Sequence, residues 1–103
     1  MAEGIIEEKI SSTKIFMLSC STDWYCAHLK QEVEKAGMSG DLVFLEVDSH
    51  PECSKVDLLN CCARLTGHRT LPRFWVKGRY LGDGGEMEKA LKSGAVSRML
   101  GRF

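Results

Sequence analysis

The sequence has no excess of charge of either sign and no long hydrophobic run. Its 14 Lys and Arg residues balance 14 Asp and Glu residues, so the formal net charge is zero. Nucleic-acid-binding proteins normally carry a basic excess, and proteins that bind anionic membranes present a cationic face. The longest apolar stretches, such as Ile15 to Leu18, are far shorter than the roughly 20 residues that cross a bilayer. We therefore expect neither a nucleic-acid partner nor a membrane partner.

A secretory signal and a metal-binding spacing are also missing. The first twelve residues include Glu3, Glu7 and Glu8, where a signal peptide would be cationic and then apolar. We therefore expect a cytoplasmic protein whose five cysteines form no structural disulfide framework. No C-x-x-C pair is present and the three histidines are scattered along the chain, so the spacing predicts no metal site.

Hydrophobic patterning in the first half predicts two buried strands with a helix between them. Residues 13–18 and 42–48 are short apolar runs, as expected for strands that are covered on both faces. Residues 24–36 place apolar side chains at spacings of three and four, which is typical of one face of a helix, and Gly37 follows as a stop signal.

The second half predicts a helix, a hairpin and two further helices. The segment Ser49–Glu52 is typical of a capping box and predicts a helix that runs to about Thr66. Residues 73–76 and 79–81 predict a β-hairpin. A second capping-box pattern spans Asp83 to Glu86 and predicts a helix, and a last amphipathic segment follows it.

The resulting order, β-α-β-α-β-β-α-α, predicts an α/β domain with a four-stranded mixed sheet and helices on both faces. A chain of 103 residues has room for one domain. We expect this domain to span residues 1–103, with residues 1–12 as an N-terminal extension or short helix.

Three segments give this order a family resemblance. Residues 65–73, LTGHRTLPR, are similar to the L-T-G-x-R-T-V-P segment of the glutaredoxin family, and residues 81–85, LGDGG, resemble its glycine-rich turn. Residues 92–94, KSG, also fit the family before the last helix. The resemblance covers nearly the whole chain. It implies the thioredoxin fold and a role in thiol and glutathione redox biology.

The resemblance further implies a site for glutathione or for an extended segment of a protein. It implies a cis peptide bond before Pro72, with the main chain of Leu71 paired to the cysteine portion of glutathione. It places the γ-glutamyl carboxylate at the main-chain N–H groups of Gly84 and Gly85, at a helix N-terminus. Each residue also has a purely structural interpretation, because glycines permit tight turns and a proline can simply end a strand.

Two further side chains belong to this predicted site. Arg69 offers a cation for the glycyl carboxylate, with a merely solvated side chain as the alternative. Tyr25, with Trp24 beside it, stands where aromatic rings would flank a bound peptide, with plain surface aromatics as the alternative.

One position departs from the family pattern. Glutaredoxins have C-x-x-C or C-x-x-S where the first helix begins, and this chain has Asp23-Trp24-Tyr25-Cys26. Asp23 therefore replaces the nucleophilic cysteine, and only the second, resolving cysteine is present. A carboxylate can accept hydrogen bonds from the free N–H groups of a helix N-terminus, but it does not attack a disulfide.

Two hypotheses follow from this departure. In the first, the protein is monomeric and binds glutathione or a thiol-containing protein partner without the standard activity. In the second, it is a glutathione-dependent thiol–disulfide oxidoreductase that works through Cys26, with Cys20 as a second thiol. Cys26 shares an apolar stripe with Leu29 and Val33, which favours burial. A Cys20–Cys26 disulfide is a further alternative.

The remaining cysteines are not predicted to take part in catalysis. Cys62 lies on the apolar face of its helix and is expected in the core, whereas Cys61 shares a polar stripe and is expected to be exposed. Cys53 lies near a predicted helix start, and the N–H groups there favour its thiolate.

Overall fold

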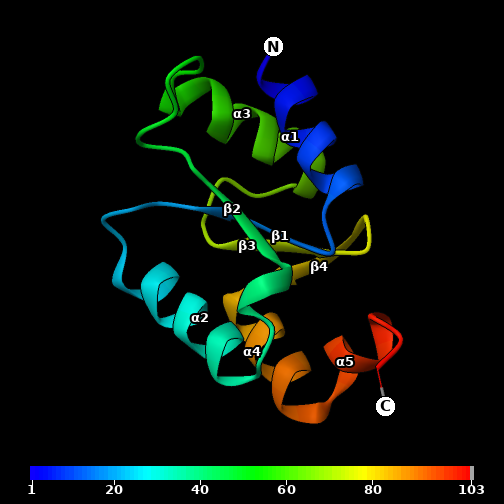
Figure 1. The fold of residues 1–103 in the computed structure, drawn as a ribbon. Helices are drawn as coiled ribbons and strands as arrows, with labels where there is room; N and C mark the ends of the chain where they lie inside the picture. Colours follow the sequence, from blue (N-terminus) through cyan, green and yellow to red (C-terminus); the bar gives the residue numbers. More distant parts are fainter. Residues whose placement is uncertain (103) are drawn as a thin grey trace.

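Four strands form one mixed sheet in the order β2-β1-β3-β4 (Figure 1). The computed structural model describes residues 1–102. Strand β1 pairs in parallel with β2, while the pairs β1–β3 and β3–β4 are antiparallel. The strands span β1 (Ile15–Ser19), β2 (Leu42–Glu46), β3 (Arg73–Val76) and β4 (Arg79–Asp83).

Helices cover both faces of this sheet, so the predicted fold class is confirmed (Figure 1). On one face lie α1 (Ala2–Ser12) and α3 (Lys55–Thr66). On the other lie α2 (Trp24–Lys35), α4 (Gly84–Ser93) and the short α5 (Ala95–Met99). A single 3₁₀ turn, η1 (Ser39–Asp41), connects α2 to β2. Within residues 1–102, no helix is both long and apolar enough to cross a membrane.

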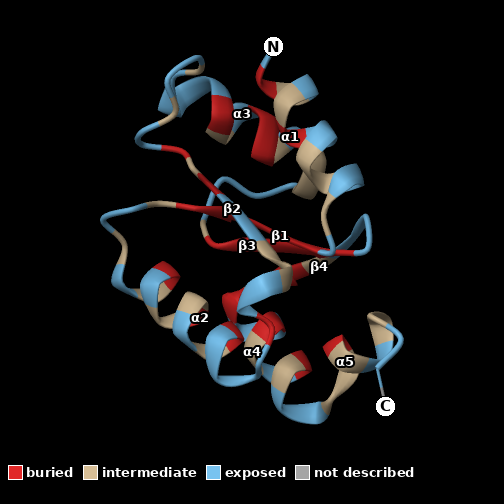
Figure 2. Ribbon diagram, in the orientation of Figure 1, coloured by how far each residue is buried: buried red, intermediate tan, exposed pale blue. Residues whose placement is uncertain are grey.

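Strand β1 shows why the sequence forms a central strand. Its side chains point alternately to the two faces of the sheet, with Phe16 and Leu18 in the core beneath α1 and α3. Ile15 and Met17 lie in the core beneath α2 and α4. All five of its residues are buried, which explains the continuous apolar run (Figure 2).

The predicted start of α3 at Ser49 is wrong. The helix begins at Lys55, and its cap is Ser54, five residues later than the predicted cap. The hydroxyl of Ser54 accepts the N–H of Asp57 at 3.1 Å. The Ser49 pattern fails because its intended partner is engaged elsewhere: the N–H of Glu52 donates to the ring of the neighbouring His50 at 3.1 Å. The end of the helix before residue 67 agrees with the prediction.

The exposure predicted for Cys61 is also wrong, because helix α1 packs on α3 and covers it. Ile6 of α1 and Cys61 of α3 are both fully buried in the same core. Arg64 of α3 donates to Glu3 of α1 at 2.9 Å, on the surface of the same contact. Burial raises the pKa of the Cys61 thiol. The expectation that Cys62 is a core residue is confirmed.

Candidate functional site

Helix α2 begins with a carboxylate bound to its free main-chain donors. Asp23 has an extended backbone and caps the helix. Its Oδ1 atom accepts the N–H of Tyr25 at 2.8 Å and the N–H of Cys26 at 3.1 Å. The first turn of a helix is a ready anion site, and here the anion is part of the chain.

The turn between β1 and α2 is held in place by a second carboxylate. Asp48, which follows β2, accepts the N–H of Ser21 at 2.9 Å and also its hydroxyl. These hydrogen bonds hold the pKa of Asp48 below its usual value. The N–H of Asp23 donates to the carbonyl of Cys20 at 3.2 Å, which closes the turn directly before the helix.

Cys26, which the family resemblance aligns with the resolving cysteine, lies in the core. Its side chain is fully buried among the residues beneath α2 and α4. Burial raises the pKa of its thiol; hydrogen bonding with Cys20 and Ser19 partly offsets this, and the charge of Asp23 raises it further. Cys20 is partly exposed, and both cysteines are free thiols. The alternative Cys20–Cys26 disulfide is therefore not formed in this structure.

Leu71 and Pro72 lie just before β3. The peptide bond between them is cis. Pro72 is buried, whereas Leu71 is half-buried and packs against the cores on both faces of the sheet. Leu71 is therefore placed at an edge where the two layers meet.

The glycine-rich turn leads from β4 into α4 and forms the capping box that the sequence predicts. Asp83 accepts the N–H of Glu86 at 3.0 Å, and Glu86 accepts the N–H of Asp83 at 3.2 Å. Gly82 has φ +143, and a Cβ atom there would collide with the Glu86 carboxylate. Only glycine fits this position beside the capping box.

Gly84 brings the predicted glycine turn into contact with the start of α2. A Cβ atom at Gly84 would lie 2.5 Å from Cε2 of Tyr25, so the aromatic ring occupies the space that a side chain would need. The tertiary structure thus places Tyr25 and Gly84 together, although they are far apart in the sequence. Gly85, the next residue, is exposed.

Arg69 and Trp24 are less closely integrated. The guanidinium of Arg69 donates to Oδ1 of Asn60 on α3. Within residues 1–102, no hydrogen bond or ion pair joins Arg69 to the other predicted site residues. Trp24 is 77% exposed, with its ring centroid 5.6 Å from that of Tyr25.

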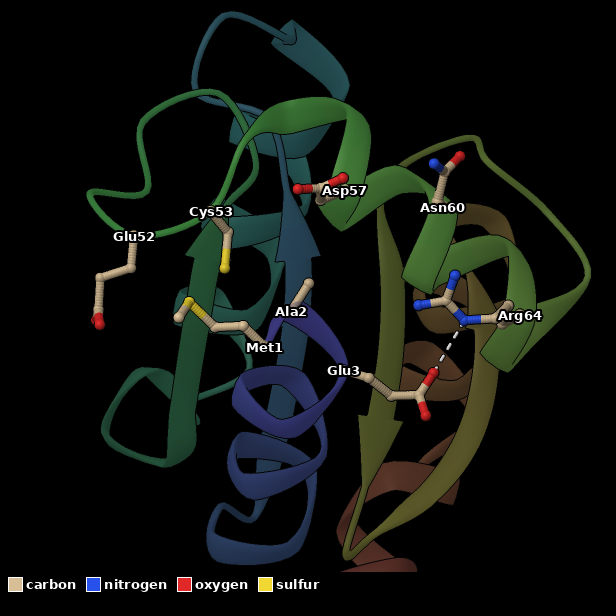
Figure 3. Close-up of a pocket in the computed structure, with 8 residues that line it drawn as sticks. All are labelled: Met1, Ala2, Glu3, Glu52, Cys53, Asp57, Asn60 and Arg64. Carbon is tan, nitrogen blue, oxygen red and sulfur yellow. Dashed lines mark hydrogen bonds and ion pairs between the residues drawn. The ribbon is translucent and has the colours of Figure 1, made fainter.

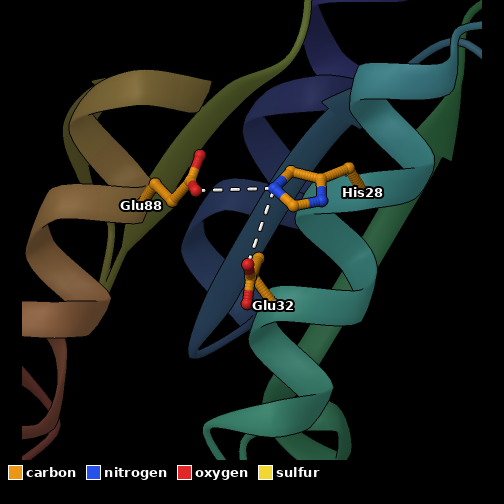
Figure 4. Close-up of side chains that lie close together, drawn as sticks. All are labelled: His28, Glu32 and Glu88. Carbon is orange, nitrogen blue, oxygen red and sulfur yellow. Dashed lines mark hydrogen bonds and ion pairs between the residues drawn. The ribbon is translucent and has the colours of Figure 1, made fainter.

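One cluster of side chains between α2 and α4 is not predictable from the sequence as a cluster. His28 and Glu32 lie one turn apart on α2, and Glu88 reaches them from α4 (Figure 4). Hydrogen bonding to His28 holds the pKa of Glu88 below its usual value. The i, i+4 spacing of His28 and Glu32 was a signal in the sequence. Nothing in the sequence indicated that Glu88 joins them.

One surface hollow lies away from the predicted glutathione site. It has a volume of about 490 Å³ and lies between α1, α3 and the segment that precedes α3 (Figure 3). The Glu3–Arg64 ion pair and the partly exposed Cys53 lie in its wall. It contains none of the predicted glutathione-binding residues.

Among known proteins, the sequence of this chain is similar to glutaredoxins. No protein-family model matches the chain. The chain is 32% identical over 76 residues to a glutaredoxin of Vernicia fordii, across 74% of this chain and 69% of that protein. It is 27% identical over 103 residues to glutaredoxin-C4 of Arabidopsis thaliana, across 93% of this chain and 68% of that protein.

Solved structures show the same similarity at the level of the fold. A buckwheat glutaredoxin in complex with glutathione superimposes with a TM-score of 0.86 at 20% identity, covering 98% of this chain and 88% of that one. At such identity the superposition shows the shared fold alone.

Proposed function

The chain belongs to the glutaredoxin family, and from that premise we propose that it binds glutathione, or an extended segment of a thiol-containing protein, without standard thiol–disulfide exchange. The family places the protein in thiol and glutathione redox biology. The observation that supports the proposal is the cap of α2, where the Asp23 carboxylate accepts the N–H groups of Tyr25 and Cys26. The family resemblance aligns this residue with the attacking cysteine.

The groups proposed for binding are main-chain groups at two ends of secondary structure. In the first turn of α4, Asp83 accepts only the N–H of Glu86, and the N–H groups of Gly84 and Gly85 have no partner inside the helix. They can therefore bind a carboxylate of the ligand. The main chain of Leu71 can pair with an extended peptide without depending on side-chain identity. The glutathione complex of the buckwheat glutaredoxin supports this ligand class.

The burial of Cys26 supports the non-enzymatic part of the proposal. Exchange begins when an exposed thiolate attacks a disulfide. Cys26 is fully buried and its pKa is raised, so it provides neither access nor thiolate near neutral pH. The competing hypothesis, an oxidoreductase that works through Cys26 with Cys20, requires this thiol to leave the core.

A titration with S-methylglutathione tests binding separately from redox chemistry, because this analogue cannot form a disulfide. We expect saturable amide shifts at Leu71, Gly84 and Gly85, with no shift at the remote Gly40. A parallel assay measures reduction of a glutathione mixed disulfide, coupled to glutathione reductase and NADPH. Turnover that is lost in Cys26→Ser would establish the competing oxidoreductase. The absence of saturable shifts would remove the proposed ligand.

We also propose that the protein acts as a monomer in the cytoplasm. The five cysteines are all free thiols, which suits a reducing compartment.

Sedimentation equilibrium with and without glutathione tests the proposed monomer, and a dimer in either condition would contradict it. Microscopy of the fluorescently tagged chain tests the compartment, and export or organelle import would contradict it.

A further inference from the structure

His28, Glu32 and Glu88 direct three potential ligand atoms to one point. The Nε2 atom of His28 lies 3.5 Å from Oε1 of Glu32 and 3.4 Å from Oε2 of Glu88. All three atoms lie within 4.8 Å of one another. Figure 4 shows the imidazole and both carboxylates turned toward the space between α2 and α4.

These separations match the edges of a metal coordination tetrahedron. Zinc bonds of about 2.0–2.1 Å to nitrogen and oxygen imply ligand atoms roughly 3.3–3.4 Å apart at tetrahedral angles. The two measured edges from Nε2 already have nearly this length. We propose that His28, Glu32 and Glu88 form a binding site for a divalent transition-metal ion, with Zn²⁺ as the best fit.

Neighbouring groups hold the proposed ligands in place. The ring of His28 stacks on Tyr25 at an interplanar angle of 14°. The hydroxyl of Tyr25 donates to Oε1 of Glu88 at 3.4 Å, which leaves Oε2 for the metal. Outer contacts of this kind orient metal ligands and tune their affinity. Tyr25 is in turn backed by Gly84, which has no side chain to displace it.

The donor set selects the class of metal. A neutral imidazole with two carboxylates suits Zn²⁺ and its neighbours in the transition series, whereas Mg²⁺ prefers oxygen ligands alone. The three side chains are half-buried, which leaves a fourth position open to water. The ammonium group of Lys92 competes with the metal for Glu88, because its Nζ atom lies 3.6 Å from Oε2 of that carboxylate. The Lys92 side chain is 73% exposed and free to turn away.

The metal ligands are distinct from the residues proposed to bind glutathione, although Tyr25 and Gly84 adjoin both sites. These ligands come from the α2–α4 contact and include neither the glycine-rich turn nor the cis-proline segment. A bound ion would connect the two helices more firmly than the present hydrogen bonds do. Failure of the metal test therefore leaves the proposed glutathione site standing, and the reverse also holds.

The test titrates the chain with Zn²⁺ by calorimetry in a Cys20→Ser and Cys53→Ser background, because these two thiols are partly exposed and cysteine sulfur is a zinc ligand in its own right. We expect one site per chain, a melting temperature that rises with zinc concentration, and a ¹⁵N shift that assigns the metal to Nε2 of His28. Mg²⁺ at the same concentration is expected to produce none of these changes.

Matched variants are expected to separate the ligands from their neighbours. His28→Ala and Glu88→Gln are each expected to weaken zinc binding at least about tenfold, since even outer contacts of a metal site are worth that much. Glu34→Gln removes an exposed charge from the same helix outside the cluster and is expected to have no such effect. Lys92→Met removes the competing ammonium and is expected to tighten binding.

Three results would overturn the assignment. One is the absence of zinc binding by the folded serine background. Another is an equal loss of affinity in Glu88→Gln and Glu34→Gln, which would indicate charge attraction alone. The third is a metal bound without perturbation of the His28 ring nitrogen. None of the substituted side chains is fully buried, so circular dichroism is expected to show that all of these proteins fold.

Discussion

Replacing the Asp23 carboxylate by a thiol is the most direct test of the proposal that this chain binds glutathione without a nucleophilic cysteine at the start of α2. In Asp23→Cys, the introduced sulfur would face the two N–H donors of Tyr25 and Cys26 that now bind Oδ1. These donors stabilise a thiolate as they stabilise the carboxylate. The same substitution also removes the one charged side chain that caps α2.

The magnitude follows from the helix terminus. An ordinary thiol with a pKa near 8.5 is only about 3% ionised at pH 7, whereas helix N-termini lower thiol pKa values to about 7.5 or below. A pKa of about 7 would make roughly half of the introduced thiol ionised, a gain of about 16-fold in thiolate. Loss of the cap costs about 1 kcal/mol, which lowers the melting temperature by roughly 4–8 °C in a domain of this size.

The assay follows reduction of a glutathione mixed disulfide. The introduced thiolate attacks the glutathione sulfur, forms a protein–glutathione disulfide and releases the small thiol. A second glutathione then attacks this protein–glutathione disulfide, which regenerates the protein thiolate and releases glutathione disulfide. Glutathione reductase and NADPH reduce that disulfide. We expect turnover well above that of the original chain. Asp23→Ser keeps a cap without sulfur, and Ser54→Cys places a thiol at the cap of α3. Neither control is expected to be active.

One result would refute the reasoning about the binding site. If Asp23→Cys folds and its thiol titrates below pH 7.5, but it turns over no faster than Ser54→Cys, the helix provides a thiolate that glutathione does not reach. A thiol that titrates at its ordinary value would instead show that the N–H donors do not stabilise it.

Three further predictions concern the packing around the site. Gly84→Ala is expected to lower the free energy of unfolding in urea by about 1–3 kcal/mol, because its Cβ atom would overpack against the Tyr25 ring. The Cβ atom of Gly85→Ala would meet no atom closer than 3.6 Å, so this control is expected to be neutral or stabilising. Equal effects would contradict the close contact. Asp48→Asn is expected to lower the urea midpoint at neutral pH. The folded-state pKa of this carboxyl is lowered, so its contribution to the free energy of unfolding is present above the ordinary pKa of 3.8 and is lost as the pH falls through the lower folded-state pKa. A difference in urea midpoint between Asp48→Asn and the original chain that persists in strong acid would be inconsistent with this. Ile6→Ala is expected to cost about 2–5 kcal/mol and to speed alkylation of Cys61, as followed by mass spectrometry, and an unchanged alkylation rate would show that α1 does not protect it.

The strands and the α2 cap could be predicted because their signals are local. Alternating side chains in β1 must face two cores, so a continuous apolar run is sufficient to indicate a buried strand. Asp23 and the Asp83–Glu86 capping box bind main-chain groups within three residues, so the sequence contains both partners. The start of α3 was mispredicted because the sequence offers two serine caps five residues apart, Ser49 and Ser54. The local pattern does not show which of the two begins the helix.

The burial of Cys61 could not be predicted from its own helix. Its stripe on α3 is polar, and it becomes buried because α1, some 50 residues earlier, covers it. The contact of Tyr25 with Gly84 likewise depends on how α2 and α4 pack on the same face of the sheet.

The sequence by itself determined the fold class, the family resemblance and the carboxylate at the start of α2, because each depends on residues close together along the chain. Only the tertiary structure decided which thiols are buried and which side chains meet across α2 and α4. His28 and Glu88 lie 60 residues apart, and their approach to 3.4 Å depends on helix packing, which no local periodicity specifies.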